Sequence, residues 1–190
     1  MSSYILIFDI KSDWHIGNGQ EGGAYADALV VKNHLNLPYL PGKSIKGLLR
    51  QAFQTAIENK WFGDESTLAT LFGCESAGEH SQGALQIGSA QLSEHETDFL
   101  LENKTAIKHL FKVLQSTSID NKTGVAKQGS LRSMEIVVPM QLQAEITLNT
   151  ELVNFQKWLK DAITLITEFG AKRHRGLGQV TVTCQKKGDA

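Results

Sequence analysis

The sequence has little of what marks a secreted or membrane protein. Its 190 residues include only two cysteines, Cys74 and Cys184. Two cysteines 110 positions apart make neither a disulfide framework nor a paired-cysteine metal site. No apolar run approaches the ~20 residues that span a bilayer, and the first ten residues lack the basic region and cleavage site of a secretory signal. We therefore expect a cytoplasmic location and no membrane partner.

An excess of either charge is also missing. Nineteen lysines and arginines stand against twenty aspartates and glutamates, which gives a net charge of −1. Because the chain has no overall field to attract a polyanion, any nucleic-acid site must be a local patch. The nearest approach to a metal cluster is Cys74, Glu75, Glu79 and His80, but one cysteine and one histidine at irregular spacing do not match a zinc site. We expect no structural zinc.

What is present is the segment order of an α+β domain. Strands are predicted over 4–10, 85–90, 140–148 and 179–185, of which the last two alternate between apolar and polar residues, and apolar residues recur with the period of helices over 43–57 and 151–169. The first strand is apolar on both faces, which indicates a central strand covered on both sides or one that opens the domain. The order βαββαβ predicts a ferredoxin-like or RRM-like core.

Two excursions interrupt this order, at about 11–41 and about 94–133, and we predict that they are insertions into a single domain spanning 1–190. The second contains a partly helical pattern over 98–114, followed by the Asx and glycine chemistry of a hairpin tip at 117–124. We interpret residues 61–83 as a loop over the core.

A basic glycine loop, residues 170–178, follows the second helix. Gly170, Gly176 and Gly178 bracket a run of four residues that are cationic or can become so: Lys172, Arg173, His174 and Arg175. Glycines allow a backbone to approach an anion closely, and basic side chains add charge-assisted donors, so the loop predicts phosphate binding. The alternative is an ordinary basic turn after a helix C-terminus.

The first helix begins with a second basic feature. Lys43, Lys46 and Arg50 follow its start at about one per turn, where helix amides already favour an anion. We expect these residues and the basic side chains of the glycine loop to form one patch. The alternative is a solvated helix face without a ligand.

Three motifs occur in order along the chain: H-I-G at 15–17 leading to L-P-G-K-S-I-K-G-L-L-R at 40–50, I-D-N-K-T-G at 119–124, and R-H-R-G-L-G at 173–178. Together they resemble the RAMP superfamily, specifically the repeating backbone subunit of type III CRISPR effector complexes. The resemblance covers nearly the whole chain. The family pattern often has proline at the position of Leu29 and arginine at that of Asn121.

This resemblance implies partners and sites. Guide CRISPR RNA would be held by His15, Lys43, Ser44, Lys46, Arg50, Lys172, Arg173, His174, Arg175, Gly176 and Gly178. A thumb that wedges into the duplex of guide and target would contain Ile119, Asp120, Asn121, Lys122 and Thr123. The further partners implied are complementary target RNA, other copies of the chain and other effector subunits.

The resemblance also implies a catalytic residue. Cleaving members of the family carry an aspartate between the first strand and first helix, and D-A-L-V-V-K at 27–32 is similar to that segment. Asp27 would then support cleavage of target RNA with Mg²⁺ or Mn²⁺, since one carboxylate suffices for a cation that keeps waters and takes phosphate oxygens. Alternatively, Asp27 is a solvated loop carboxylate.

Two other functions stay open. Metal-independent RNA processing would use His15 and His174 as general acid and base, since histidine suits both proton steps near neutral pH. A non-catalytic scaffold would bind RNA without cutting it.

Overall fold

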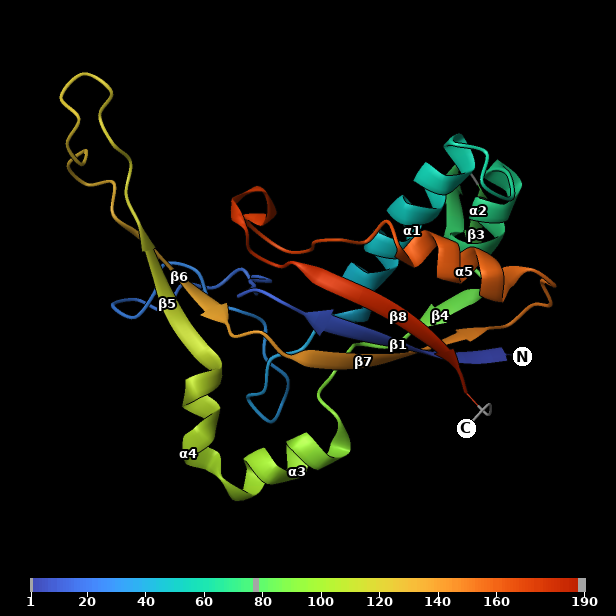
Figure 1. Ribbon diagram of the computed structural model, residues 1–190, viewed down its shortest axis with the longest axis horizontal. Coiled ribbons are helices and arrows are strands. Elements are labelled where there is room, and N and C mark those ends of the chain that lie inside the picture. Colours follow the sequence, from blue (N-terminus) through green and yellow to red (C-terminus); the bar gives the residue numbers. More distant parts are fainter. Residues whose placement is uncertain (1, 77–78, 188–190) are drawn as a thin grey trace.

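The computed structural model describes residues 2–76 and 79–187. Its centre is a four-stranded antiparallel sheet in the order β4 (Leu85–Ile87), β7 (Gln141–Leu148), β1 (Ser2–Ile10) and β8 (Val180–Lys186). Counted along the core, this is second, third, first and fourth strand, with β1 in the middle (Figure 1). The predicted ferredoxin-like fold is confirmed.

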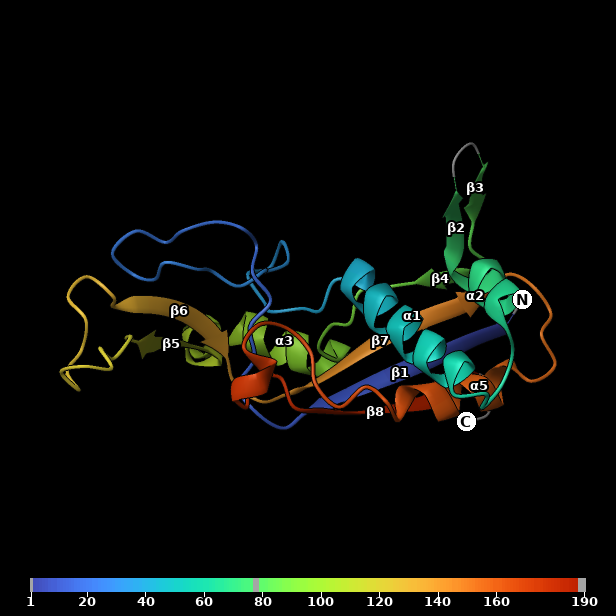
Figure 2. The same cartoon turned by 90° about the horizontal axis from the view of Figure 1, so that it is seen from above.

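One face of the sheet is buried. Every second residue of β7 from Leu142 to Leu148 points into the core, and β1 buries Tyr4, Leu6, Phe8 and Ile10 in the same way. The residues between them on β1, such as Ile5 and Ile7, are only partly covered. The first strand is therefore central, but the prediction that both its faces could be covered is wrong, because the two long helices lie on one side (Figure 2).

Helices α1 (Gly42–Glu58) and α5 (Phe155–Ile163) cover that buried face. They meet through Phe53 and Phe155, whose rings stack with centroids 6.4 Å apart. The second helix is shorter than the predicted 151–169 because its last part forms extended pairing instead. Phe169 donates its N–H to the Gly178 carbonyl, and Val180 donates to the Thr167 carbonyl. Residues 164–169 still bury apolar side chains, which explains the helix-like pattern.

The interpretation of residues 61–83 as a loop is wrong. The segment forms α2 (Glu65–Phe72) and a hairpin of β2 (Gly73–Ser76) and β3 (Glu79–Gln82). The Asp64 carboxylate accepts a hydrogen bond from the Thr67 N–H at 2.9 Å and starts the helix as a capping box. Leu71 and Phe72 then anchor it to the core.

A second unit stands away from the sheet. It consists of α3 (Glu94–Glu102), α4 (Lys104–Ile107), the 3₁₀ turn η1 (Lys108–Leu110) and the paired strands β5 (Phe111–Ser116) and β6 (Arg132–Val137). The β5–β6 hairpin projects beyond the rest of the molecule and ends in a long irregular tip (Figures 1 and 2). The helical pattern predicted over 98–114 is right as far as Leu110, after which the chain is a strand.

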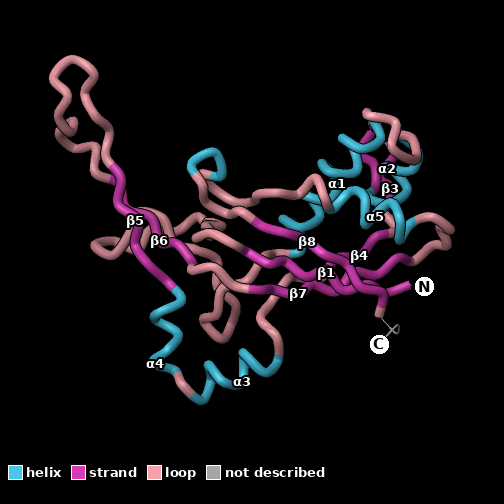
Figure 3. The backbone as a smooth tube through the Cα atoms, viewed as in Figure 1, coloured by secondary structure: helices cyan, strands magenta, loops and turns pink. Residues whose placement is uncertain are grey.

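The segment 11–41 contains no regular helix or strand and runs as a loop beside β6 (Figure 3). Single bridges fix its course: Trp14 pairs with Val137, and Ala28 pairs with Met134. Trp14 is fully buried and packs against Phe169 with ring centroids 5.5 Å apart. None of the helices in the described ranges is long and apolar enough to cross a membrane.

Candidate nucleic-acid interface

Three of the segments singled out in the sequence meet at one cleft of about 390 Å³. Its walls come from 15–17, from the first turns of α1 and from 169–171. The lining residues are His15, Ile16, Gly17, Leu40, Ser44, Gly47, Leu48, Gln51, Phe169, Gly170 and Ala171. Segments from opposite ends of the chain therefore build one concave surface.

Backbone contacts hold the glycine loop against the first insertion. Ala171 donates its N–H to the His15 carbonyl at 2.9 Å. Gly170 has a φ of +81°, and a Cβ there would lie 2.4 Å from the same carbonyl oxygen. A Cβ at Gly178 would lie 1.9 Å from the Phe169 oxygen. These two glycines are thus required by the packing of the chain itself.

Gly176 differs from its neighbours. Its φ is +83°, but a Cβ there would meet no atom within 4 Å. It follows a short 3₁₀ turn, η2 (Arg173–Arg175), whose three side chains are exposed. The turn therefore presents its basic residues to solvent. This exposure is compatible with phosphate binding and equally with an ordinary basic turn that has no ligand.

His15 is a fixed wall of the cleft. It is 3 % exposed, and its Nδ1 lies 2.6 Å from the carbonyl oxygen of Glu135. A Cβ on Gly17 would come within 3.1 Å of His15 Nε2, so the small residue leaves room for the ring. The imidazole is held by β6 on one side and faces the cleft on the other.

Helix α1 presents two different faces. Ser44, Gly47, Leu48 and Gln51 line the cleft. Lys43, Lys46 and Arg50 share a neighbouring stripe, because residues three and seven apart lie on one side of a helix, and none of them lines the cleft. The predicted basic residues thus flank the cleft on α1 and do not form its floor.

Gly47 is unusual for a helix interior. A glycine there is about 1 kcal/mol less favourable than alanine, and among the described residues no atom beyond its chain neighbours and the backbone of its own helix lies within 4 Å of the position a Cβ would take. The packing of this chain gives no reason for glycine at 47. Space at this point of the cleft wall suits the close approach of another molecule.

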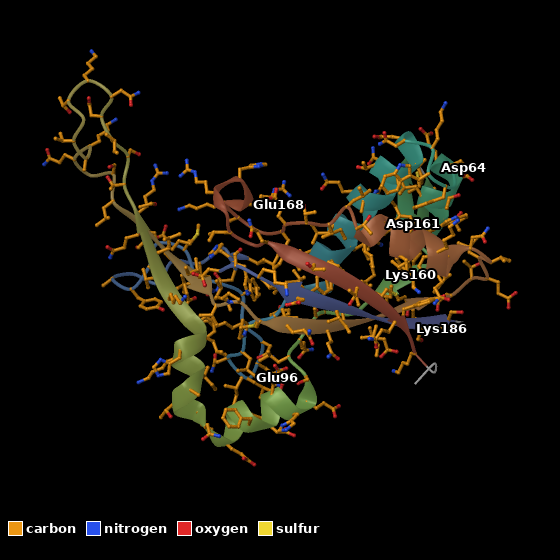
Figure 4. The ribbon with its side chains drawn as sticks, viewed as in Figure 1. Asp64, Glu96, Lys160, Asp161, Glu168 and Lys186 are labelled. Carbon is orange, nitrogen blue, oxygen red and sulfur yellow. The ribbon has the colours of Figure 1, made fainter. Side chains whose placement is uncertain are left out.

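A second hollow of about 320 Å³ continues the cleft along α1. Leu48 and Gln51 belong to both, and Arg173 and His174 line the second. We call the two together the α1 groove. The His174 Nδ1 lies 3.9 Å from a carboxylate oxygen of Glu168, which Figure 4 shows at the base of the basic turn.

Most cations near the groove are available to a ligand. Among the described residues, the side chains of Lys43, Lys46, Arg50, Arg173 and Arg175 have no hydrogen bond or ion pair. Lys172 is different, since its Nζ donates to the Ser116 hydroxyl of β5 at 3.3 Å and ties the glycine loop to the hairpin. The chain is close to neutral, yet a local cationic surface borders the groove.

Asp27 does not line the groove. It is exposed, its N–H donates to the Ser133 carbonyl, and its Oδ2 accepts the Ser133 N–H at 2.6 Å. The structure therefore places this carboxylate near the start of β6, where one of its oxygens is already engaged.

Glu135 is the residue that sequence reasoning missed. It is 1 % exposed, with Oε1 2.9 Å from Lys32 Nζ and Oε2 accepting the Val30 N–H at 3.1 Å. Burial, and secondly Glu135, raise the pKa of the Tyr25 phenol above its ordinary value. A lone acid in the apolar run 134–138 was the available signal, because a buried carboxylate needs partners.

The hairpin tip is ordered by Asp120. Its Oδ1 accepts the N–H groups of Lys122 at 2.8 Å and Thr123 at 3.1 Å, and these bonds lower the pKa of the carboxyl group. Ile119, Val125 and Leu131 are 63–66 % exposed, so the tip shows apolar side chains to solvent. Asn121, Lys122 and Thr123 are exposed beside them.

No group of three or more histidine, cysteine or acidic side chains gathers as a cation site in the described part of the chain. The side chains of Glu75, Glu79 and His80 lie outside that part, so the expectation of no structural zinc stays a prediction.

The sheet order and its two covering helices define a ferredoxin-like domain with a cationic groove. The family model of the RAMP superfamily matches residues 7–181, and the chain belongs to this superfamily. No curated protein sequence matches the chain significantly.

Solved structures agree in fold. A chain of the type III-B Cmr-beta complex bound to cognate target RNA superposes with a TM-score of 0.75 and 11 % identity, over 96 % of each chain. A chain of the apo Cmr-beta complex gives 0.71 and 12 %, over 98 % of each. A chain of a type IV-B CRISPR complex gives 0.67 and 14 %, covering 99 % of this chain and 92 % of that one.

Proposed function

We propose that this protein is a CRISPR RNA-binding backbone subunit of a type III effector complex. The observation that carries the proposal is the α1 groove, in which the three segments 15–17, 42–51 and 169–174 meet. Membership of the RAMP superfamily and the likeness in fold to chains of Cmr-beta complexes support the same assignment.

The groove suits a single RNA strand. Arg173, which lines the groove, and the nearby Arg175, Lys46 and Arg50 of η2 and α1 would supply charge-assisted donors for phosphates. Gly47 leaves space in the wall of the groove, where a sugar–phosphate backbone can lie close to the helix. This contact is independent of base sequence, as a subunit that accepts many guides requires.

The β5–β6 hairpin is the proposed thumb. It projects from the core (Figure 1), and the loop between its strands carries the exposed residues Ile119, Val125 and Leu131. Apolar side chains at a protruding tip suit insertion between base steps, which unstacks them. Neighbouring copies and other effector subunits would complete the assembly.

Asp27 is the proposed cleavage residue. Its Oδ2 is engaged by Ser133, and no hydrogen bond or ion pair occupies Oδ1 among the described residues. One free carboxylate oxygen would be enough to hold Mg²⁺ or Mn²⁺, because such a cation keeps several of its waters and takes RNA phosphate oxygens as further ligands. When bound, such a cation stabilises charge on the phosphate.

The reaction proposed is attack of a 2′-OH of the target on its adjacent phosphate, which breaks the bond from phosphorus to the 5′-oxygen of the next nucleotide. The products are a 2′,3′-cyclic phosphate and a 5′-hydroxyl, with the proton of the 2′-OH passing to solvent and the leaving oxygen taking a proton from solvent. The need for the 2′-OH restricts cleavage to RNA. The chain's own part is positioning: β6 holds Asp27 through Ser133, and the hairpin that β6 belongs to would hold the unstacked nucleotide in line.

The histidine mechanism has less support. His15 is 3 % exposed with Nδ1 committed to the Glu135 carbonyl, whereas the His174 side chain is 87 % exposed. A buried wall residue and a solvent-exposed one do not form a matched acid and base without rearrangement. The non-catalytic scaffold differs from the leading proposal only in the absence of cleavage.

The test begins with RNA that co-purifies with the full chain, followed by cleavage of a complementary target. Asp27→Asn keeps an oxygen that can accept the Ser133 N–H but removes the charge, so it separates chemistry from loop structure. We expect guide and target affinity close to wild type and cleavage lower by orders of magnitude, with equal loss when the attacking 2′-OH is replaced by hydrogen.

The rival functions give different results. Cleavage that persists in EDTA and in Asp27→Asn, but fails in His15→Ala or His174→Ala, would establish the histidine mechanism instead. Tight guide binding without cleavage by any form of the protein or its complex would leave the scaffold. No bound RNA at all would refute the proposed function.

A further inference from the structure

A larger hollow than either part of the α1 groove lies between the first insertion and the α4–β5 segment. Its volume is about 690 Å³, within the roughly 300–1,000 Å³ of small-ligand sites. Tyr25, Lys32 and His34 line it from one side, and Lys104, Lys108 and Phe111 line it from the other, with Glu135 also in its wall. It shares no residue with the α1 groove. We call it the Tyr25 pocket.

The pocket carries a net positive charge despite containing Glu135. Both oxygens of that buried carboxylate are engaged, by Lys32 Nζ and by the Val30 N–H. Lys32 is therefore neutralised within the chain, and its Nζ also lies 4.0 Å from the centroid of the Phe111 ring. The remaining lysines, Lys104 and Lys108, are exposed and have no hydrogen bond or ion pair among the described residues.

The placement of these two lysines indicates an anion. They are four residues apart on consecutive helical turns, α4 and η1, so their side chains project on the same side. Like charges at this spacing repel each other and destabilise the segment. An anionic group between them would remove that repulsion.

Tyr25 supplies the second kind of surface. Tyr25 is 50 % exposed, and its phenol lies near the buried Glu135 carboxylate, which contributes to raising the Tyr25 pKa. An exposed aromatic ring beside unpaired lysines is the combination that stacks a base and binds its phosphate. An acidic peptide would use the lysines but would not need the exposed ring.

The position of the pocket selects which strand it meets. Tyr25 is two residues from Asp27, which limits their Cα separation to about 7 Å. Glu135 is likewise two residues from Ser133, the partner of Asp27. A strand placed at Asp27 for cleavage therefore passes the Tyr25 pocket within about one nucleotide.

We infer that the Tyr25 pocket binds one nucleotide of the target RNA strand next to the cleavage position, with the base on Tyr25 and the phosphate on Lys104 and Lys108. The inference rests on the proposed function for the presence of RNA, but it concerns a surface separate from the α1 groove. It adds a positioning site, because a nucleotide fixed there limits how the neighbouring phosphate lies against Asp27.

The experiment uses the full chain with its guide and a complementary target that carries a single photoreactive 4-thiouridine beside the cleavage position. Irradiation should cross-link the target to the peptide that contains Tyr25. The double variant Lys104→Ala/Lys108→Ala should lose this cross-link and lower the slope of log affinity against log salt by about 0.7 per lost phosphate contact. Tyr25→Ala should weaken target binding about tenfold, and Tyr25→Phe should restore it.

The matched control is Lys157→Ala/Lys160→Ala, which removes two exposed lysines from α5. Figure 4 shows Lys160 at the opposite end of the molecule from α4. This pair should leave the cross-link and the salt slope unchanged.

Several results would overturn the inference. An unchanged cross-link and salt slope in the Lys104 and Lys108 variant, with guide still bound, would refute the pocket alone. A cross-link at Tyr25 that forms only when the thiouridine is in the guide would show that the pocket binds the guide strand, and it would refute the assignment to the target. If the Lys104 and Lys108 variant kept target binding but lost self-association in sedimentation, the pocket would be a contact for an acidic surface of another protein copy and not for RNA. Absence of all RNA binding would refute the proposed function together with the inference.

Discussion

Replacing Gly47 with alanine should separate the stability of this protein from the RNA binding that we propose for it. Alanine is favoured over glycine in a helix interior by about 0.8–1.0 kcal/mol, and a Cβ at 47 meets no atom of the described residues within 4 Å beyond its chain neighbours and the backbone of its own helix. The substitution should therefore raise the free energy of unfolding by about 0.5–1 kcal/mol. For a domain of this size that corresponds to a rise in Tm of about 1–4 °C.

The effect on RNA should have the opposite sign. Gly47 lines the cleft at the start of the α1 groove, so a methyl group there occupies space that we assign to the RNA backbone. We expect guide affinity to fall about tenfold, which is about 1.4 kcal/mol. Thermal unfolding and fluorescence anisotropy with a labelled guide measure the two effects on the same preparation.

A control on the same helix makes the comparison specific. Gln54 is exposed on α1 two turns after Gly47 and lines neither part of the groove, so Gln54→Ala should leave guide affinity unchanged. A Gly47→Ala protein that is more stable and binds guide as well as wild type would refute the groove. A less stable protein would show that the helix reasoning at 47 is wrong.

Three further outcomes follow from the structure. Gly170→Ala should destabilise the fold by about 1–3 kcal/mol, because it forces a strained backbone as well as a clash with the His15 carbonyl. Gly176→Ala has the positive φ without the clash and should destabilise the fold less. Equal losses of stability in thermal unfolding would contradict this. The Asp120 pKa is lowered by the N–H groups of Lys122 and Thr123, so the turn is fully stabilised above the ordinary value of 3.8 and loosens as pH falls through the lowered value. Amide shifts of Lys122 and Thr123 that do not move on acidification to pH ~2 would argue against the turn. Burial raises the Cys184 pKa to about 11 from 9.0, so its contribution to stability is present below pH 9.0 and lost as pH rises through about 11. Thiol reagents should label Cys184 slowly at pH ~8 until the protein is unfolded, and rapid labelling of the native protein would contradict the burial.

Local patterns were enough to predict the core. β7 alternates strictly between buried and exposed residues, and α1 carries one apolar stripe, so each could be recognised without its neighbours. The end of α5 could not, because residues 167–169 pair with the start of β8, and that partner is about ten residues away and outside the helical pattern. Helix α2 was missed although Asp64 and Thr67 form a capping box, because only two of its residues are buried.

In the candidate site, too, contacts between residues far apart in the chain could not be predicted from local patterns. From the order of the motifs, residues 15–17, the start of α1 and the glycine loop were predicted to bind the same guide RNA. The structure places these three segments at one cleft. Glu135 was not predicted, since its partners Val30 and Lys32 lie more than 100 positions earlier in the chain. Asp27 was predicted as the catalytic carboxylate of a loop after the first strand, but its attachment to Ser133, more than 100 positions later in the chain, was not predicted.

That attachment bears on how cutting would be positioned. The Asp27 Oδ2 and N–H both bond to Ser133, and Ala28 pairs with Met134, so the Asp27 loop is fixed to β6 at consecutive points. β6 in turn pairs along its whole length with β5 to form the projecting hairpin. If the hairpin tip sets where the target strand is unstacked, the same rigid ladder sets where Asp27 lies relative to that nucleotide. The spacing between the unstacked nucleotide and the cleaved phosphate would then be a property of one hairpin. It would not depend on the sequence of a guide bound in the α1 groove, so the proposed subunit would cut at a fixed position while reading no bases.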